Sequence, residues 1–68
     1  MRYSVVFERA DRGYAAYVPD LPGCVATGRT RRDVERRIRE AIEFHVTGLR
    51  IEHLPVPRPR AWTGAVEV

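Results

Sequence analysis

The carboxylates, histidines and cysteine of this sequence are the groups suited to acid–base or metal chemistry. A two-metal nuclease site needs several carboxylates around ions about 4 Å apart, and its only plausible members here are Glu8, Asp20 and Glu43. Glu8 follows Phe7 on a predicted strand, so these side chains point to opposite faces, and Glu43 lies off the apolar stripe of a predicted helix. The three carboxylates are not expected to converge, and we predict no catalytic residue.

The two histidines and the single cysteine do not complete a metal site either. A tetrahedral zinc site needs four ligands, so carboxylates would have to join them, and we expect no metal and no other cofactor. His45 falls within the apolar stripe of the predicted helix, which favours a core histidine bonded to a backbone carbonyl. Cys24 is interpreted as a buried thiol, since nothing in the sequence brings it to His45.

Composition limits the class of protein. A chain of 68 residues is expected to form one domain, residues 1–68, whose small core oligomerisation would support. A lone cysteine excludes an intrachain disulfide, and with no export signal it predicts a cytoplasmic protein. No apolar run approaches the roughly 18 residues of a membrane span, so we expect no membrane partner.

The basic charge points to a possible anionic partner. The net charge is +3, and all 12 basic residues are arginine, which suits nucleic acid or an acidic protein but equally a bias in genome composition. Arg31, Arg32 and Arg36 lie in the first turns of the predicted helix, where the helix dipole favours anions. They are the candidate contacts for an anion or nucleic acid, with simple solvation as the alternative.

Hydrophobic periodicity predicts three strands before one helix. Residues 2–9 alternate, residues 11–13 supply a turn, residues 14–18 alternate again, and residues 24–28 form a short third strand. Thr30 is the predicted N-cap, with Asp33 as its reciprocal partner, for a helix over residues 31–50.

A fourth strand is predicted after the helix. Three alternating prolines favour extended chain, and residues 61–68 then alternate in a strand-like pattern that begins near Trp62, which is expected to pack in the core. The fold class is therefore α+β: a single β-β-β-α-β domain, an antiparallel meander with one helix on one face.

The segment between the second and third predicted strands carries turn residues. Pro19, Pro22 and Gly23 are interpreted as structural, because proline sets φ near −65° and glycine permits a positive φ. Asp20 has two readings, acceptance of backbone amides within the turn or contact with a partner. Exposed aromatic residues are the other candidates, so the partner-binding set is Tyr14, Tyr17, Asp20 and Phe44.

The sequence resembles the HicB family of type II antitoxins over roughly residues 3–50. The resemblance rests on Tyr3-Ser4-Val5-Val6-Phe7, on the Gly-Tyr-Ala-Ala-Tyr-Val-Pro-Asp-Leu-Pro-Gly-Cys run of residues 13–24, and on Gly28-Arg29-Thr30 before a helix with Ala41-Ile42-Glu43. It implies a partial RNase H-like fold without nuclease activity. It also implies that the chain binds and blocks a small HicA-type toxin, an mRNA endonuclease.

These expectations describe a non-enzymatic bacterial antitoxin domain that forms a homodimer or higher homo-oligomer. Longer members of the family carry a C-terminal DNA-binding domain, and since this sequence shows no such domain, DNA binding is not expected. The alternative is an orphan HicB-like module that binds nucleic acid through its arginine-rich helix.

Overall fold

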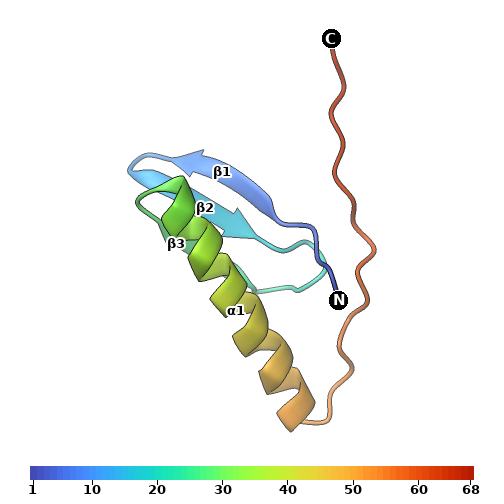
Figure 1. The fold of residues 1–68 in the computed structure, drawn as a ribbon. Helices are drawn as coiled ribbons and strands as arrows, with labels where there is room; N and C mark the ends of the chain where they lie inside the picture. The colour runs from blue at the N-terminus through green and yellow to red at the C-terminus, as the bar shows by residue number, and fades with distance from the viewer.

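A computed structural model describes residues 1–68 and shows three strands followed by one helix (Figure 1). The elements are β1 (Val6–Ala10), β2 (Gly13–Tyr17), β3 (Val25–Gly28) and α1 (Arg31–Ile51). The predicted α+β meander with one helix on one face is confirmed. The expected fourth strand is absent.

The sheet is antiparallel with the strand order β1-β2-β3. Its register places Phe7, Ala16 and Ala26 side by side, and the neighbouring row is Val6, Tyr17 and Val25. Because side chains alternate along a strand, these two rows lie on opposite faces. Ala16 is buried under the helix, so the Phe7 row faces α1 and the Tyr17 row faces away from it.

The core lies between α1 and the β2–β3 half of the sheet. Its buried residues are Ala16, Val18, Leu21, Cys24, Val34 and Ile38. The backbones of Gly28 and Val34 approach closely, since a Cβ on Gly28 would stand 2.6 Å from the Val34 amide nitrogen. This contact holds the start of α1 against β3, and α1 packs on β2 and β3 but not on β1.

Residues 18–24, here called the turn segment, form two consecutive turns. The Leu21 amide donates to the Val18 carbonyl at 3.1 Å, and the Cys24 amide donates to the Leu21 carbonyl at 3.0 Å. Gly23 has φ +84°, which with Pro22 before it fits a type II turn. The structural role of Pro19, Pro22 and Gly23 stays a prediction, which this geometry supports. Between the turns the Leu21 side chain is fully buried.

The helix begins at the predicted cap. The Thr30 hydroxyl accepts from the Asp33 amide at 3.0 Å. Asp33 does not return to the Thr30 amide, as a capping box would; its carboxylate accepts from the Arg29 amide, one residue earlier, at 3.3 Å. The Asp33 carboxylate thereby joins the helix start to the end of β3.

The C-terminal residues correct two predictions. After α1 the chain is extended and forms no strand (Figure 1), and Trp62 is 87% exposed instead of packed in the core. The alternation of residues 61–68 is real, but a strand needs a neighbour for its backbone groups. The chain leaves the sheet after Ala61 and meets none.

His45 corrects a third prediction. Its side chain is half-buried on α1, yet no hydrogen bond joins its ring to a backbone carbonyl. The apolar stripe correctly predicts that the ring lies on the half-buried side of α1. The backbone carbonyls of a helix interior already accept hydrogen bonds within their own helix, so no free carbonyl lies beside the ring.

Candidate partner-binding surfaces

The sheet face turned away from α1, here called the open sheet face, is the first candidate surface. Its central row consists of Val6, Tyr17 and Val25, which are adjacent across the three strands. Tyr17 is 42% exposed and Val25 is 65% exposed. Glu8, Ala15 and Thr27 form the next row. An apolar row with an aromatic centre and a polar border is typical of a protein-binding surface.

Tyr14 lies on the other side of the same strand. It packs against the core from the helix-facing side and is half-buried. Tyr14 and Tyr17 therefore lie on opposite faces of the sheet, and of the two only Tyr17 is presented on the open sheet face.

Asp20 binds the chain that follows the helix. One carboxylate oxygen, Oδ2, accepts from the backbone amides of Arg60 and Ala61, each at 3.0 Å. These two amides, helped by the Arg60 charge, hold the pKa of Asp20 below its ordinary value. Asp20 does accept backbone amides, but from residues 40 and 41 positions away and not from its own turn.

Two side chains before β1 also bind the segment that follows α1, and the sequence does not predict either contact. The Tyr3 hydroxyl donates to the Pro57 carbonyl at 2.6 Å, and the Ser4 hydroxyl donates to the Ala61 carbonyl at 2.9 Å. A tyrosine and a serine in an alternating strand pattern carry no signal for partners more than 50 residues away. The result is a chain that is held firmly up to Ala61.

Phe44 is exposed on α1, away from the sheet. It is 83% exposed and lies beside a shallow hollow of about 460 Å³ that also involves Arg36, Arg37, Glu40 and Ala41. Phe44 and Tyr17 therefore belong to different surfaces, so the four candidate residues Tyr14, Tyr17, Asp20 and Phe44 do not form one site.

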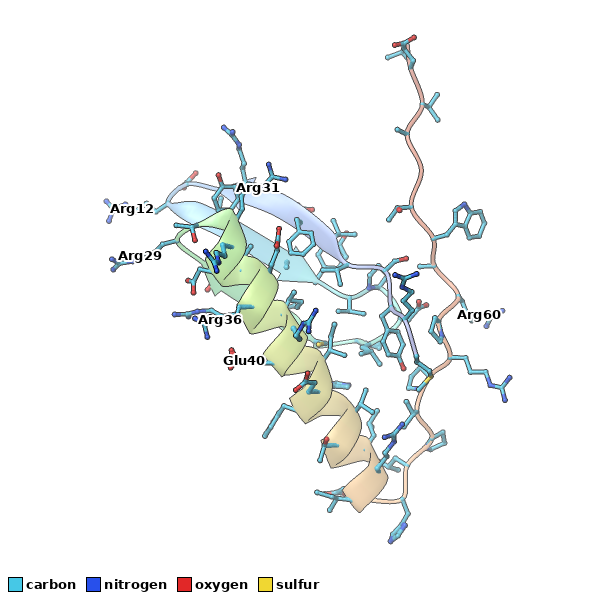
Figure 2. The ribbon with its side chains drawn as sticks, in the orientation of Figure 1. Arg12, Arg29, Arg31, Arg36, Glu40 and Arg60 are labelled. Carbon is cyan, nitrogen blue, oxygen red and sulfur yellow. The ribbon has the colours of Figure 1, made fainter.

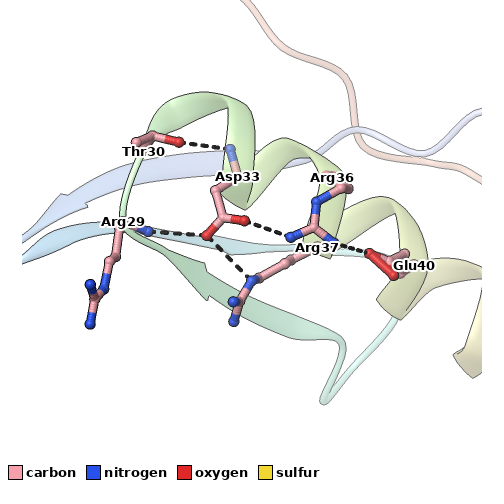
Figure 3. A network of polar contacts seen from close by, with 6 residues as sticks. All are labelled: Arg29, Thr30, Asp33, Arg36, Arg37 and Glu40. Atoms are coloured by element: carbon pink, nitrogen blue, oxygen red, sulfur yellow. Dashed lines mark hydrogen bonds and ion pairs between the residues drawn. The ribbon is translucent and has the colours of Figure 1, made fainter.

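The arginines differ in how free they are. The Arg36 guanidinium is paired with the Asp33 carboxylate at 2.7 Å and with the Glu40 carboxylate at 2.8 Å (Figure 3). Arg37 also reaches Asp33, at 3.3 Å. The Arg36 hydrogen bond is the main reason why the pKa of Asp33 is lowered. Arg31 and Arg32 form no ion pair, so of the three predicted anion contacts only these two are free.

Four of the unpaired arginines lie at one end of the molecule. Figure 2 shows Arg12, Arg29 and Arg31 at the end of the sheet where α1 begins. Arg12 and Arg29 line one hollow of about 250 Å³, together with Thr27, Gly28, Asp33 and Arg37. We call Arg12, Arg29, Arg31 and Arg32 the arginine-rich end. It is a solvated cationic surface with no buried polar group aimed into it.

An apolar groove runs beside β1, because α1 does not cover this strand. Met1, Val5, Phe7, Ile38 and Ile42 line it, with Glu35, Arg39 and Glu43 at its border, and its volume is about 370 Å³. Phe7 remains 48% exposed in it. We call it the β1 groove. The sequence predicts a helix over the sheet, but it does not determine how far the helix shifts toward β3. It therefore does not predict the groove.

The groups suited to metal chemistry remain apart. The structure brings no three histidine, cysteine, aspartate or glutamate side chains together in an arrangement that would hold a metal ion. Cys24 is buried as expected, and burial raises the pKa of its thiol. Helix α1 does not combine the length and apolar character that crossing a membrane requires.

Comparison with known proteins gives consistent matches. The family model for the HicB-like antitoxin of bacterial toxin–antitoxin systems matches residues 3–66. A UPF0150 protein of Synechocystis is 42% identical over 57 residues, covering 82% of this chain and 72% of that protein. An uncharacterised 14.9 kDa protein of Haemophilus phage HP1 is 34% identical over 58 residues, and this chain spans only 44% of its length.

A solved structure extends the match to three dimensions. A chain of the HicA3 and HicB3 toxin–antitoxin complex superposes with a TM-score of 0.75 at 30% identity, covering 87% of this chain and 70% of that chain. The similarity therefore includes nearly the whole of the fold described above.

Proposed function

The chain belongs to the HicB-like antitoxin family of bacterial toxin–antitoxin systems, and we propose that it binds and neutralises a small HicA-type mRNA endonuclease. In this role the chain is not an enzyme; it occupies a surface that the toxin needs. Both proteins then act in the bacterial cytoplasm, where the toxin meets mRNA.

One observation carries the proposal. The solved chain that this protein resembles comes from a complex of a toxin with its antitoxin, at 30% identity and a TM-score of 0.75. A likeness over 87% of this chain supports a shared binding role more strongly than a single motif does.

The open sheet face is the surface we propose for the toxin. Tyr17 is flanked across the strands by Val6 and Val25, and an aromatic residue within an apolar row is the usual composition of a binding hot spot. Phe44 is more exposed, but charged side chains surround it. It is the weaker candidate; Tyr14 faces the core on the other side of the sheet, and Asp20 holds the segment after α1.

Co-expression with the small open reading frame next to this gene tests the proposal. We expect a stable complex of the two proteins in which cleavage of RNA by the toxin stops. Tyr17→Ala should weaken the complex by at least about 30-fold, as for a hot-spot residue. Phe44→Ala is the matched control, an exposed aromatic on another surface, and should change the affinity little.

Two outcomes would count against this reading. If the pair forms no complex and RNA cleavage is undiminished, the antitoxin role is wrong. If the complex forms but Phe44→Ala weakens it and Tyr17→Ala does not, the role stands and the surface is wrongly assigned. Melting temperatures of both variants show whether either change acts through the fold instead.

A second candidate function rests on the arginine-rich end. Arg12, Arg29, Arg31 and Arg32 carry no ion pair, and three of them are seen together at the start of α1 (Figure 2). Unpaired arginines at a helix start suit a phosphate backbone, so a HicB-like module that binds nucleic acid is the alternative. Arg36 contributes less, because Asp33 and Glu40 hold it.

Filter binding separates this alternative from the first. RNA or DNA retained by the protein should be released as salt is raised, and Arg31→Ala with Arg32→Ala should flatten the salt dependence. Arg58→Ala, an exposed arginine on the segment after α1, is the control. No retention at low salt would remove this function.

A further inference from the structure

The last seven residues have no contact that explains their composition. Residues 62–68, here called the C-terminal arm, are exposed throughout; Trp62 is 87% and Val66 88% exposed. Trp62, Gly64, Val66 and Val68 occupy alternate positions, so in an extended chain their side chains share one face. Such a segment has the pattern of a strand that buries one face.

The course of the chain directs the arm away from its own sheet. Four hydrogen bonds hold the preceding residues: Tyr3 to Pro57, Ser4 to Ala61, and Asp20 to Arg60 and to Ala61. Beyond them the arm runs away from the sheet to the C-terminus, which lies far from the other elements (Figure 1). The attachment therefore presents the arm to another molecule.

The molecule also has an unused position for a strand. β1 pairs with β2 alone, so its other edge is free. The β1 groove lies next to that edge on the helix-facing side, and its lining is largely apolar. A strand added at this edge could place the side chains of one face into the groove, as in strand addition to a sheet edge.

We propose that the C-terminal arm of one copy adds as a strand to the free edge of β1 in a second copy, with Trp62 and Val66 in the β1 groove, and that the second copy returns the same contact. The exchange is symmetric about a two-fold axis, so both arms and both β1 edges are used and the assembly closes as a dimer.

A second copy of this chain is a better partner for the arm and the β1 groove than another molecule, for two reasons. Each chain has one arm and one free β1 edge with its groove. In a dimer of two such chains, each arm therefore occupies the β1 edge of the other chain, and no arm or edge is left unpaired. The isolated chain is also poorly buried: only 6 of 68 residues are buried, while ten large apolar side chains are exposed. A free edge strand beside exposed apolar groups is a liability that natural proteins cover.

The exchange goes beyond toxin binding, since it uses the β1 groove and not the open sheet face, and it can be tested without any toxin. The solution mass of the full chain should be that of a dimer. Trp62 is the only tryptophan, so its fluorescence should be that of a buried indole and shift to the red on dilution.

Full-length variants assign the contact. Trp62→Asp combined with Val66→Asp should weaken the dimer by about 30-fold or more, without loss of helical circular dichroism, because neither side chain is part of the monomer's core. Phe7→Glu should weaken it from the groove side. Phe44→Ser, at an exposed aromatic outside the contact, should leave the mass unchanged.

Mixing the variants distinguishes exchange between chains from other arrangements. The arm variant has an intact groove and the Phe7→Glu variant has an intact arm, so together they should form a heterodimer joined by one arm, although each alone is monomeric. A monomeric full chain, with Trp62 either exposed or folded back on its own β1, would overturn the proposal. So would a dimer that persists in the arm variant, whatever the toxin assay shows.

Discussion

The turn segment and the C-terminal arm have the same length, but the turn segment contributes to the core and the arm is exposed. Residues 18–24 close on themselves through backbone bonds from Leu21 to Val18 and from Cys24 to Leu21, and they bury Leu21 completely. Residues 62–68 carry a larger apolar side chain, Trp62, and bury nothing. The backbone groups of the turns find their partners within a few residues, whereas a strand at residues 62–68 would need a sheet edge, and the chain before it directs these residues away from their own sheet. Apolar composition alone does not decide burial; the availability of a surface does.

The largest expected difference between the two segments comes from removing their main apolar side chains. Leu21→Ala should lower the free energy of unfolding by about 2–5 kcal/mol, because a fully buried leucine leaves a cavity. Trp62→Ala, measured at a concentration where the chain is monomeric, should change it by less than about 0.5 kcal/mol, as at an exposed site. Urea unfolding of both variants checks this. Equal losses would contradict the comparison.

Substitution of one glycine in each segment tests how strongly the backbone conformation is restricted there. Gly23 has φ +84° and open space where a Cβ would lie, so Gly23→Ala should cost about 1–2 kcal/mol through conformational strain alone. Gly64 is also unobstructed, and its φ lies outside the left-handed region. Gly64→Ala in the monomer should therefore be close to neutral. Thermal unfolding of the pair measures the difference, and a neutral Gly23→Ala would argue against the type II turn.

The helix cap provides a smaller local test. Thr30→Ala removes the oxygen that accepts from the Asp33 amide and should destabilise the protein by about 1 kcal/mol. Thr63→Ala removes a hydroxyl from the arm, which makes no hydrogen bond in the monomer, and should have no measurable effect. Calorimetry of the two variants decides; a destabilising Thr63→Ala at low concentration would mean that the arm is not free.

The smallest expected effect is a pH dependence where the two regions meet. The Arg60 and Ala61 amides lower the pKa of Asp20, so its folded-state pKa lies below the unfolded one. Its contribution is then complete above the unfolded pKa and is lost as pH falls through the folded pKa. Amide signals of Arg60 and Ala61, followed by NMR during acid titration, should change while that of Leu21 stays constant. In Asp20→Ala they should already be altered at neutral pH.

The sequence by itself determined the elements whose partners are near in the chain. The alternation of residues before and after Gly13 produced the β1–β2 pair, and Thr30 began the helix where its hydroxyl meets the Asp33 amide. Pro22 and Gly23 restrict φ directly, so their turn follows from residue type. The family resemblance followed from the same segment, and the comparisons support it.

Only the tertiary structure decided the contacts between distant residues. The bonds from Asp20 to Arg60 and Ala61, the shift of α1 toward β3 and the exposure of Trp62 depend on how completed elements pack. A periodic pattern reports which face of a segment is apolar, but it does not report which surface will cover that face. For the C-terminal arm we propose that this surface belongs to a second copy, and this is the physical reason why residues 61–68 alternate as a strand does although the predicted strand is absent from the single chain.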